Sequence, residues 1–240
     1  MLLSIVVPTL NEELAIEKTL KQVRDNLTAY EYELIVADSE SDDRTAEIAR
    51  HYATTVIITK RHHTIGWNRN QGAAVAHGDY LAFIDADVFV PDPNHFFKIV
   101  LDDFAADPNL VGITTRLTVF PQDATWLDNI VFGLTNLRHR HRNNVTHKGS
   151  ASGEVMMIRR AAFEQLHGFQ EALAAAEDED MFVRLATIGR TFMEWRLTVY
   201  HTGRRAHQIG WPRLWLQWFL NNFYVKHFKR SYSSEWKQIR

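Results

Sequence analysis

The stretch Tyr80-Leu-Ala-Phe-Ile-Asp-Ala-Asp-Val88 decides the fold class of this 240-residue chain. Its apolar run ends in two carboxylates one residue apart, Asp85 and Asp87. Residues i and i+2 of a strand point to the same side, so these carboxylates converge where a buried strand gives way to a loop. Hard oxygen ligands of this kind suit Mg²⁺ or Mn²⁺, which usually bridge to a substrate's phosphates. A turn that only ends the strand is the alternative interpretation.

Around this stretch, apolar runs alternate with helical periodicities. The pattern predicts strands at residues 3–7, 33–37, 55–59 and 79–84 and helices at 12–27, 41–53 and 68–77. Asn11 and Ser41 are the expected caps of the first two helices. Strands that alternate with helices indicate an α/β fold whose central sheet is mainly parallel, with right-handed crossovers.

In such sheets, ligands bind outside the carboxyl ends of the strands. Polar side chains follow these strand ends, and we expect them to gather along one edge. They are Thr9, Asn11, Asp38, Ser39, Asp85 and Asp87.

The second half of the chain changes character. Its periodicities predict helices at 94–106, 126–137, 161–166 and 178–188 and strands at 111–120, 155–158 and 191–199. Residues 138–148 are basic and polar without an apolar period, which predicts a mobile loop.

Composition excludes several classes of function. The net charge of −2 shows that the molecule lacks the excess of basic residues typical of nucleic-acid-binding proteins, so no nucleic-acid partner is expected. The chain has no cysteine, which excludes disulfides, thiolate zinc sites and cysteine nucleophiles. The N-terminal stretch lacks the basic region of a signal peptide, and no apolar run approaches the roughly 18 residues of a membrane span. We therefore expect a cytoplasmic protein, with peripheral contact at the inner face of the membrane left open.

Six segments, in order and spacing, resemble the inverting family 2 glycosyltransferases of the GT-A fold. These are Val6–Glu12, Val36–Thr45, Gly66–Gly72, Gly78–Asp87, Gly153–Phe169 and Glu177–Leu185. The resemblance spans about residues 4–190 and implies a hexosyltransferase-like enzyme. Such an enzyme moves a sugar from a UDP- or GDP-type nucleotide-diphosphate donor to an acceptor hydroxyl, with Mg²⁺ or Mn²⁺ as cofactor.

The resemblance also divides the chain. It implies one domain over residues 1–204, with a Rossmann-like nucleotide-sugar half (1–90) and an acceptor and catalytic half (91–204). A basic, aromatic, helical extension follows at 205–240. Packing on its own domain, dimerisation and peripheral membrane contact remain open roles for this extension.

Residues for the donor follow from the same resemblance. The nucleotide-sugar candidates are Pro8, Thr9, Asn11, Glu12, Asp38, Arg69, Asp85, Ala86 and Arg204. Arg69 is expected to pair with Asp38 or to donate to phosphate. The metal candidates are Asp87, Asp85 and His201, with Asp87 ranked above Asp85, whose other role is to contact ribose.

The acidic segment Glu177-Asp-Glu-Asp180 resembles the family's Glu-Asp motif, in which the aspartate is the general base. The resemblance makes Asp178 the base, with Glu177 and Asp180 as positioning groups. A register shifted to Glu179-Asp180 is an alternative, and a helix cap with a solvated face is the structural interpretation. Gly153 and Glu154 are the acceptor candidates.

Two other functions stay open. One is a catalytically inactive module that binds sugar nucleotides. The other, less favoured, is a nucleotidyltransferase, because that class needs a glycine-rich basic loop where this chain has Pro8–Glu12. The acceptor is equally open between a lipid-linked sugar, a small metabolite and a glycan.

Overall fold

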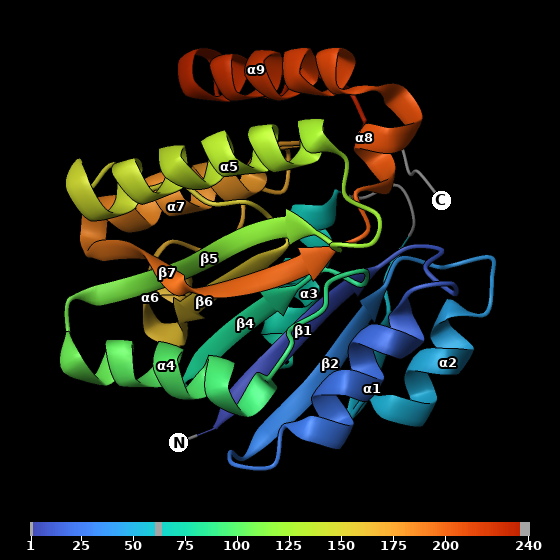
Figure 1. Ribbon diagram of the computed structural model, residues 1–240. Coiled ribbons are helices and arrows are strands. Elements are labelled where there is room, and N and C mark those ends of the chain that lie inside the picture. The colour runs from blue at the N-terminus through green and yellow to red at the C-terminus, as the bar shows by residue number, and fades with distance from the viewer. Residues whose placement is uncertain (1, 61–63, 236–240) are drawn as a thin grey trace.

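The computed structural model describes residues 2–60 and 64–235, which form a seven-stranded sheet flanked by helices (Figure 1). The strands are β1 (Leu3–Thr9), β2 (Tyr32–Asp38), β3 (Thr55–Ile58), β4 (Tyr80–Ile84), β5 (Leu110–Val119), β6 (Val155–Arg159) and β7 (Arg190–His201). The helices are α1 (Ile16–Asn26), α2 (Thr45–Tyr52), α3 (Ile65–Ala74), α4 (Pro93–Ala106), α5 (Trp126–Arg140), α6 (Arg160–Gln165), α7 (Glu177–Ile188), α8 (Arg204–Ile209) and α9 (Trp211–Phe228), with a π-helical turn η1 (His141–Val145).

The strand order is β3-β2-β1-β4-β6-β5-β7. Strands β1 to β4 pair in parallel, and β5 pairs in parallel with β7, so the predicted mainly parallel α/β sheet is confirmed. Strand β6 is the exception and lies antiparallel between β4 and β5. The parallel arrangement brings the carboxyl ends of β1, β2 and β4 to one edge, where Thr9 is paired with Asp38.

The core lies on both faces of this sheet, and β1 shows why. Ile5 and Val7 pack into the cluster under α1 and α4, whereas Val6 between them packs into the cluster with α6 and α7. Alternate residues of a strand point to opposite faces, so a strand that is covered on both faces is apolar throughout.

The first two helices begin later than predicted, and Asn11 and Ser41 do not cap them. Helix α1 starts at Ile16 and α2 at Thr45. Asn11 has a positive φ of 54°, and its side chain accepts from the backbone of Asp42 at 2.7 Å. Ser41 donates to Asp38 instead. Both residues therefore tie strand-end loops together.

The predicted mobile loop at residues 138–148 is also wrong over most of its length. Helix α5 continues to Arg140, and η1 follows without a break. Buried polar groups hold this segment: Asn143 donates to the carbonyl oxygens of His139 (2.9 Å) and Ser150 (2.6 Å). No apolar period is needed where side-chain amides satisfy the buried backbone.

The extension packs on its own domain through one side of α9. Trp211, Leu214 and Val225 are buried, and the Trp211 indole donates to Asp128 of α5 at 2.8 Å. Within the part of the chain that the structure describes, no helix combines the length and hydropathy needed to cross a bilayer.

Candidate active site

The edge formed by β1, β2 and β4 opens into a cavity of about 780 Å³. Most of the predicted donor and metal residues line this larger cavity, and they lie at or just after the carboxyl ends of β1, β4 and β7. The predicted residues found there are Pro8, Thr9, Asn11, Glu12, Asp85, Ala86, Asp87, His201 and Arg204. The structure thus brings together strand ends from both halves of the chain.

Asp38 lies behind this cavity and is not part of its lining. Its carboxylate is buried and accepts from the Thr9 hydroxyl at 2.9 Å and from the Ser41 backbone at 2.9 Å. These bonds join the loops after β1 and β2. The predicted contact of Asp38 with base or ribose stays a prediction.

Arg204 connects the loop after β1 with the acidic pair. Its Nη2 donates to Glu12 at 2.5 Å, and its Nε lies 3.5 Å from Asp87. Thr202 donates to the same Asp87 carboxylate at 2.7 Å. Burial raises the pKa of Glu12 even though Arg204 opposes the shift. An anion that binds here meets a guanidinium already oriented by two carboxylates.

Helix α1 holds the loop that carries the acidic pair. The Thr19 hydroxyl donates to the carbonyl oxygens of Ala86 (2.7 Å) and Val88 (3.0 Å). The Gln22 side chain both donates to Val88 and accepts from the backbone of Val90. Asp87 is therefore presented from a rigid loop.

Arg69 does not pair with Asp38, which was one of its two predicted roles, and donation to phosphate stays a prediction. Its side chain, 1% exposed, donates to Glu177 at 2.6 Å, to Asp85 at 2.8 Å and to the Gly153 carbonyl at 2.9 Å. Burial alone would lower the pKa of Arg69, but the two carboxylates outweigh it and raise that pKa. Burial also raises the pKa of Asp85 to about 7, with Arg69 opposing the shift. One guanidinium thus joins the strand end of β4 to the start of α7.

A smaller cavity of about 400 Å³ opens at the start of α7. Asp178 and Glu177 line it, as do the acceptor candidates Gly153 and Glu154. Burial, followed by the charge of Glu177, raises the pKa of Asp178 well above its usual value. A carboxylate with a raised pKa inside a cavity is suited to proton transfer.

The other two carboxylates of the acidic segment, Glu179 and Asp180, are each paired with an arginine. Asp180 accepts from Arg184 at 2.7 Å and lines neither cavity. No contact with a cavity therefore supports its predicted positioning role. Glu179 accepts from Arg138 at 2.5 Å and from the Ser150 hydroxyl at 2.6 Å. These pairs favour Asp178 over the shifted register.

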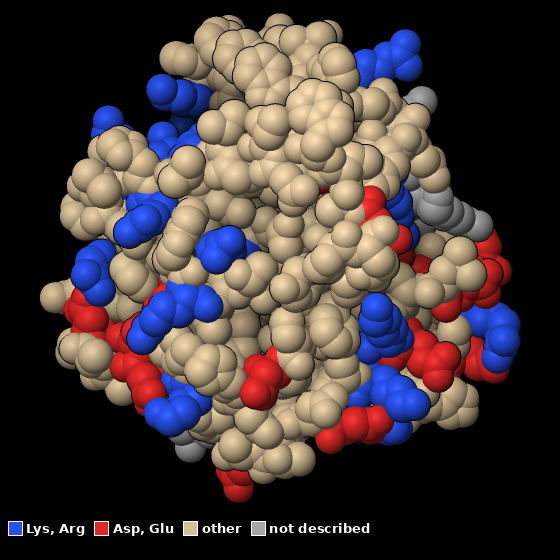
Figure 2. Space-filling view, in the orientation of Figure 1, with Lys and Arg blue, Asp and Glu red and all other residues tan. Residues whose placement is uncertain are grey.

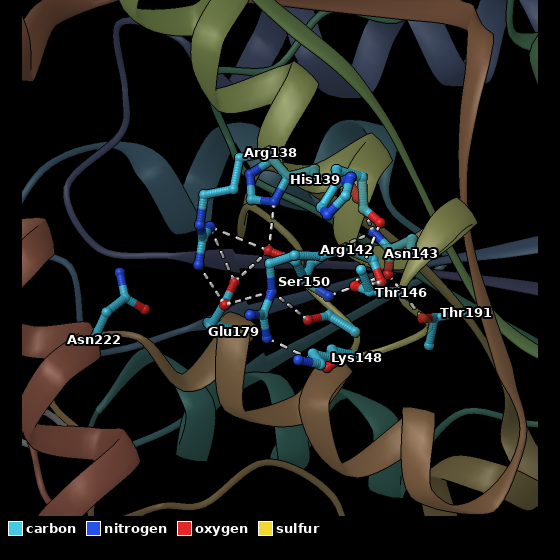
Figure 3. Close-up of polar contacts among 12 residues, drawn as sticks. Arg138, His139, Arg142, Asn143, Thr146, Lys148, Ser150, Glu179, Thr191 and Asn222 are labelled. Atoms are coloured by element: carbon cyan, nitrogen blue, oxygen red, sulfur yellow. Dashed lines mark hydrogen bonds and ion pairs between the residues drawn. The ribbon is translucent and has the colours of Figure 1, made fainter.

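Figure 3 shows a polar network at the wall of the smaller cavity, with Arg138, Ser150 and Glu179 joined by dashed contacts. His139 shares a 2.7 Å hydrogen bond with Ser150, and burial lowers its pKa to about 4. Asn222 of α9 lies across from this network, and its buried side-chain oxygen has no hydrogen-bond partner within the described residues. That oxygen is available to accept from a bound molecule.

The two cavities meet. Asp85 and Glu154 line both, and so do apolar residues on their shared rim, namely Ile65, Phe132 and Trp218. Burial raises the pKa of Glu154, with a hydrogen bond from Ser152 opposing the shift. The two cavities are therefore adjacent at Asp85 and Glu154.

The described residues contain no cluster of three His, Asp or Glu side chains arranged as a complete metal site. Mg²⁺ commonly takes only one or two carboxylates and completes its shell with water and substrate phosphate. Asp87 fits that partial role better than Asp85, because a guanidinium lies 2.8 Å from Asp85 but 3.5 Å from Asp87, whose close partner is the uncharged Thr202 hydroxyl.

His201 presents a buried ring nitrogen to the same cavity. Burial lowers its pKa to about 4, so the ring is neutral at pH 7. The Gly203 backbone donates to Nδ1 at 3.3 Å, which leaves the proton on Nε2, an atom without a partner in the described chain. A donor at Nε2 can bond a phosphate oxygen, and the predicted metal contact of His201 stays a prediction.

Sequence reasoning missed the aromatic walls of the smaller cavity. Phe132 of α5 faces Trp215, Trp218 and Phe219 of α9 across it. The only signal was the run of aromatic residues three and four apart in α9, which core packing explains equally well.

The fold has close counterparts among solved structures. A mannosyltransferase from Pyrobaculum calidifontis, solved with GDP-Man and Mn²⁺, aligns with a TM-score of 0.74 at 19% identity over 99% of this chain and 65% of its own. TarS from S. aureus with UDP-GlcNAc aligns with a TM-score of 0.65 at 18% identity over 84% of this chain and 58% of that one. The expected GT-A fold is thereby confirmed, and at these identities the likeness speaks for the fold alone.

Sequence relatives point the same way. Succinoglycan biosynthesis protein ExoA of Rhizobium meliloti is 31% identical over 77% of this chain and 58% of its own length. O-antigen chain rhamnosyltransferase WbaN of Salmonella anatum is 28% identical over 78% and 61%. The chain thus spans about three fifths of these relatives. Residues 4–167 match the family described as glycosyl transferase family 2, and the chain belongs to that family.

Proposed function

We propose that the chain is a metal-dependent, inverting glycosyltransferase whose larger cavity binds the nucleotide-sugar donor and whose smaller cavity binds the acceptor. We call the larger one the donor cavity and the smaller one the acceptor cavity. The observation that carries the proposal is their junction at Asp85 and Glu154, with Asp178 on the acceptor side. Family membership and the GDP-Man and UDP-GlcNAc complexes of the structural neighbours support a nucleotide-sugar donor.

In this proposal the transfer is a single displacement. Asp178 takes the proton of the acceptor hydroxyl while that oxygen attacks the anomeric carbon of the donor sugar. The bond from the anomeric carbon to the diphosphate oxygen breaks, and the nucleoside diphosphate leaves with the electron pair. Attack from the acceptor side, opposite the leaving group, inverts the anomeric centre.

The charges of the donor cavity support a diphosphate there. Arg204 and the Nε2–H of His201 are donors for phosphate oxygens, and Asp87 would hold Mg²⁺ or Mn²⁺. A bound divalent cation would neutralise charge that builds on the leaving diphosphate.

Arg69 is a positioning residue in this scheme. It touches Asp85 at the junction and Glu177 beside the base, and it acts on the reaction through these two carboxylates. Its guanidinium fixes both carboxylates and therefore fixes the distance between donor and base.

A thermal melt with nucleotide and metal tests the donor cavity. UDP or GDP with Mn²⁺ should raise the melting temperature, and Asp87→Ala should abolish the part of the rise that requires Mn²⁺. Asp102→Ala, an exposed aspartate paired with Lys98 on α4, is the matched control and should keep the full rise. A Mn²⁺-dependent part of the rise that survives in Asp87→Ala would contradict the metal assignment.

A screen of nucleotide sugars for slow hydrolysis with Mn²⁺ would then identify the donor. Hydrolysis of one sugar nucleotide supports an enzyme. Binding without hydrolysis or transfer of any donor would instead support the inactive module.

A further inference from the structure

Helices α5 and α9 share an apolar surface that the described chain leaves uncovered, called here the α5–α9 face. It consists of Trp126, Leu127, Ile130, Leu134 and Leu137 on α5 and Trp215, Leu216, Phe219, Phe223 and Phe228 on α9. Leu134 is 63% exposed and Phe219 54% exposed. The helices lie side by side, because Phe132 and Trp211 meet edge to face at 5.4 Å. Contiguous apolar surface of this kind marks an interaction site.

The aromatic members form an ordered row along α9. Trp215 stacks on Phe219 with centroids 5.9 Å apart, and Phe219 stacks on Phe223 at 6.4 Å. The buried side of α9 carries Trp211, Leu214 and Val225, so the row belongs to the opposite side. The exposed aromatics are therefore additional to those that pack the helix onto its domain.

The charge around the face is mainly basic, although the exposed Asp123 and Glu235 lie just before α5 and after α9. From Trp195 to Ser234 the chain has seven Lys and Arg residues and no Asp or Glu, although the whole chain has a net charge of −2. The one acidic residue of α5, Asp128, is buried. In Figure 2 uncharged residues cover the top of the molecule, Lys and Arg lie at its margins, and Asp and Glu lie lower.

We propose that the α5–α9 face seats on an anionic lipid bilayer. Exposed Trp, Phe and Leu with a rim of Lys and Arg match the chemistry of a membrane interface. A second copy of this chain fits less well, because pairing the face with itself would oppose two basic rims.

The acceptor cavity opens at this face. Trp215 and Phe219 belong to the face and also line the cavity that holds Asp178. The consequence, which rests on the proposed function, is that the acceptor is an amphiphile of the bilayer. Its hydroxyl-bearing end would reach Asp178 while its apolar part stays in the lipid.

Co-sedimentation with lipid vesicles tests the surface directly. The protein should bind vesicles of phosphatidylcholine mixed with phosphatidylglycerol, bind phosphatidylcholine alone weakly, and lose affinity as salt rises. A variant with Ile130→Ser, Leu134→Ser, Leu216→Ser and Phe223→Ser should bind at least about tenfold more weakly. None of these four residues lines either cavity. Leu14→Ser with Ile58→Ser, exposed apolar residues elsewhere, should bind as the parent does.

A charge variant gives a second readout that does not depend on the apolar changes. Arg140→Glu with Lys226→Glu should remove the preference for anionic vesicles, a loss of about tenfold or more. Lys21→Glu with Arg50→Glu, exposed cations of α1 and α2, should keep that preference. Circular dichroism and the nucleotide-dependent melt would establish that each variant is folded.

Two results would overturn the proposal. One is failure of the parent protein to bind the mixed vesicles. The other is a concentration-dependent dimer in sedimentation velocity that the apolar variant abolishes, which would make the face a contact between copies. Vesicle binding needs neither donor nor acceptor, so its failure would leave the donor assignment untouched.

Discussion

The donor cavity and the acceptor cavity are built by different means. The donor cavity is lined by loops that leave parallel strands, and side chains such as Thr19 and Asp38 tie those loops through the backbone. The acceptor cavity lies between α5, α7 and α9, and polar side chains fix one another behind it. The topology of the sheet thus builds the first site, whereas tertiary packing of distant helices builds the second. Substitutions on the two sides should therefore fail in different ways.

The largest effect is expected on the acceptor side, from Asp178→Asn. Loss of the general base should lower the transfer rate about 10²–10⁴-fold. The donor dissociation constant should not change, because Asp178 does not line the donor cavity. Asp180→Asn is the matched control and should retain most of the rate, since Asp180 pairs with Arg184 outside the cavity. Near-normal transfer by Asp178→Asn would refute the assignment of the base.

The pH dependence of the same rate follows from burial. Because the pKa of Asp178 is raised, the carboxylate gains its proton, and loses its function as a base, well above pH 3.8. The rate should therefore decline on mild acidification. A rate that stays flat down to pH 4 would contradict this environment for Asp178.

Arg69→Met should destabilise both the end of β4 and the start of α7, which Arg69 joins at the junction of the two cavities. The substitution leaves Asp85 and Glu177 without their buried partner, which should lower the free energy of unfolding by about 3–5 kcal/mol. Urea unfolding measures the change. Arg44→Met removes an exposed pair with Glu47 and should leave the unfolding midpoint nearly unchanged. Equal midpoints for the two variants would mean that Arg69 does not hold the halves together.

The polar network behind the acceptor cavity should make stability sensitive to acid. Burial lowers the pKa of His139 from the ordinary 6.5 of an imidazole to about 4 in the folded state. The stabilisation by the neutral ring is complete above pH 6.5 and is lost as pH falls towards 4, on the order of 3 kcal/mol. His139→Asn should flatten the slope of stability against pH over that range, whereas His95→Asn, on the exposed side of α4, should not. A slope equal in all three proteins would exclude His139 as the cause.

The smallest effect is expected from Thr19→Val on the donor side. It removes a buried hydroxyl that donates to Ala86 and Val88, which should cost about 1–2 kcal/mol of stability. Because the loop that carries Asp87 loses these bonds, the affinity for the donor should also fall a few-fold, while the pH profile of transfer should not change. Thr187→Val, at the exposed end of α7, is the control. Unchanged donor affinity in Thr19→Val would show that the loop is rigid without α1.

The contrast between the cavities also explains how far the sequence could predict them. The run at Tyr80–Val88 and the alternation of strands and helices around it were sufficient to predict the parallel strands β1 to β4. They also predicted the edge of the sheet where Thr9 and Asp87 line one cavity. Strand polarity alone brings these ends together, so the local pattern is enough.

The features of the site that the sequence did not predict depend on tertiary packing. Arg69 was recognised as a candidate, but its two carboxylate partners are 16 and 108 residues away along the chain, and the second depends on how α7 docks. Polar residues in 138–148 indicated a loop, because burial of Asn143 is invisible in a pattern of apolar residues. The face of α9 that turns to the acceptor cavity was equally undetermined.

A crystal structure with UDP or GDP and Mn²⁺ tests the central claim most directly. We expect the nucleotide in the cavity lined by Pro8–Glu12, with its diphosphate between Asp87 and Arg204 and the acceptor cavity left open towards Asp178. A nucleotide bound between α5 and α9 instead would contradict it.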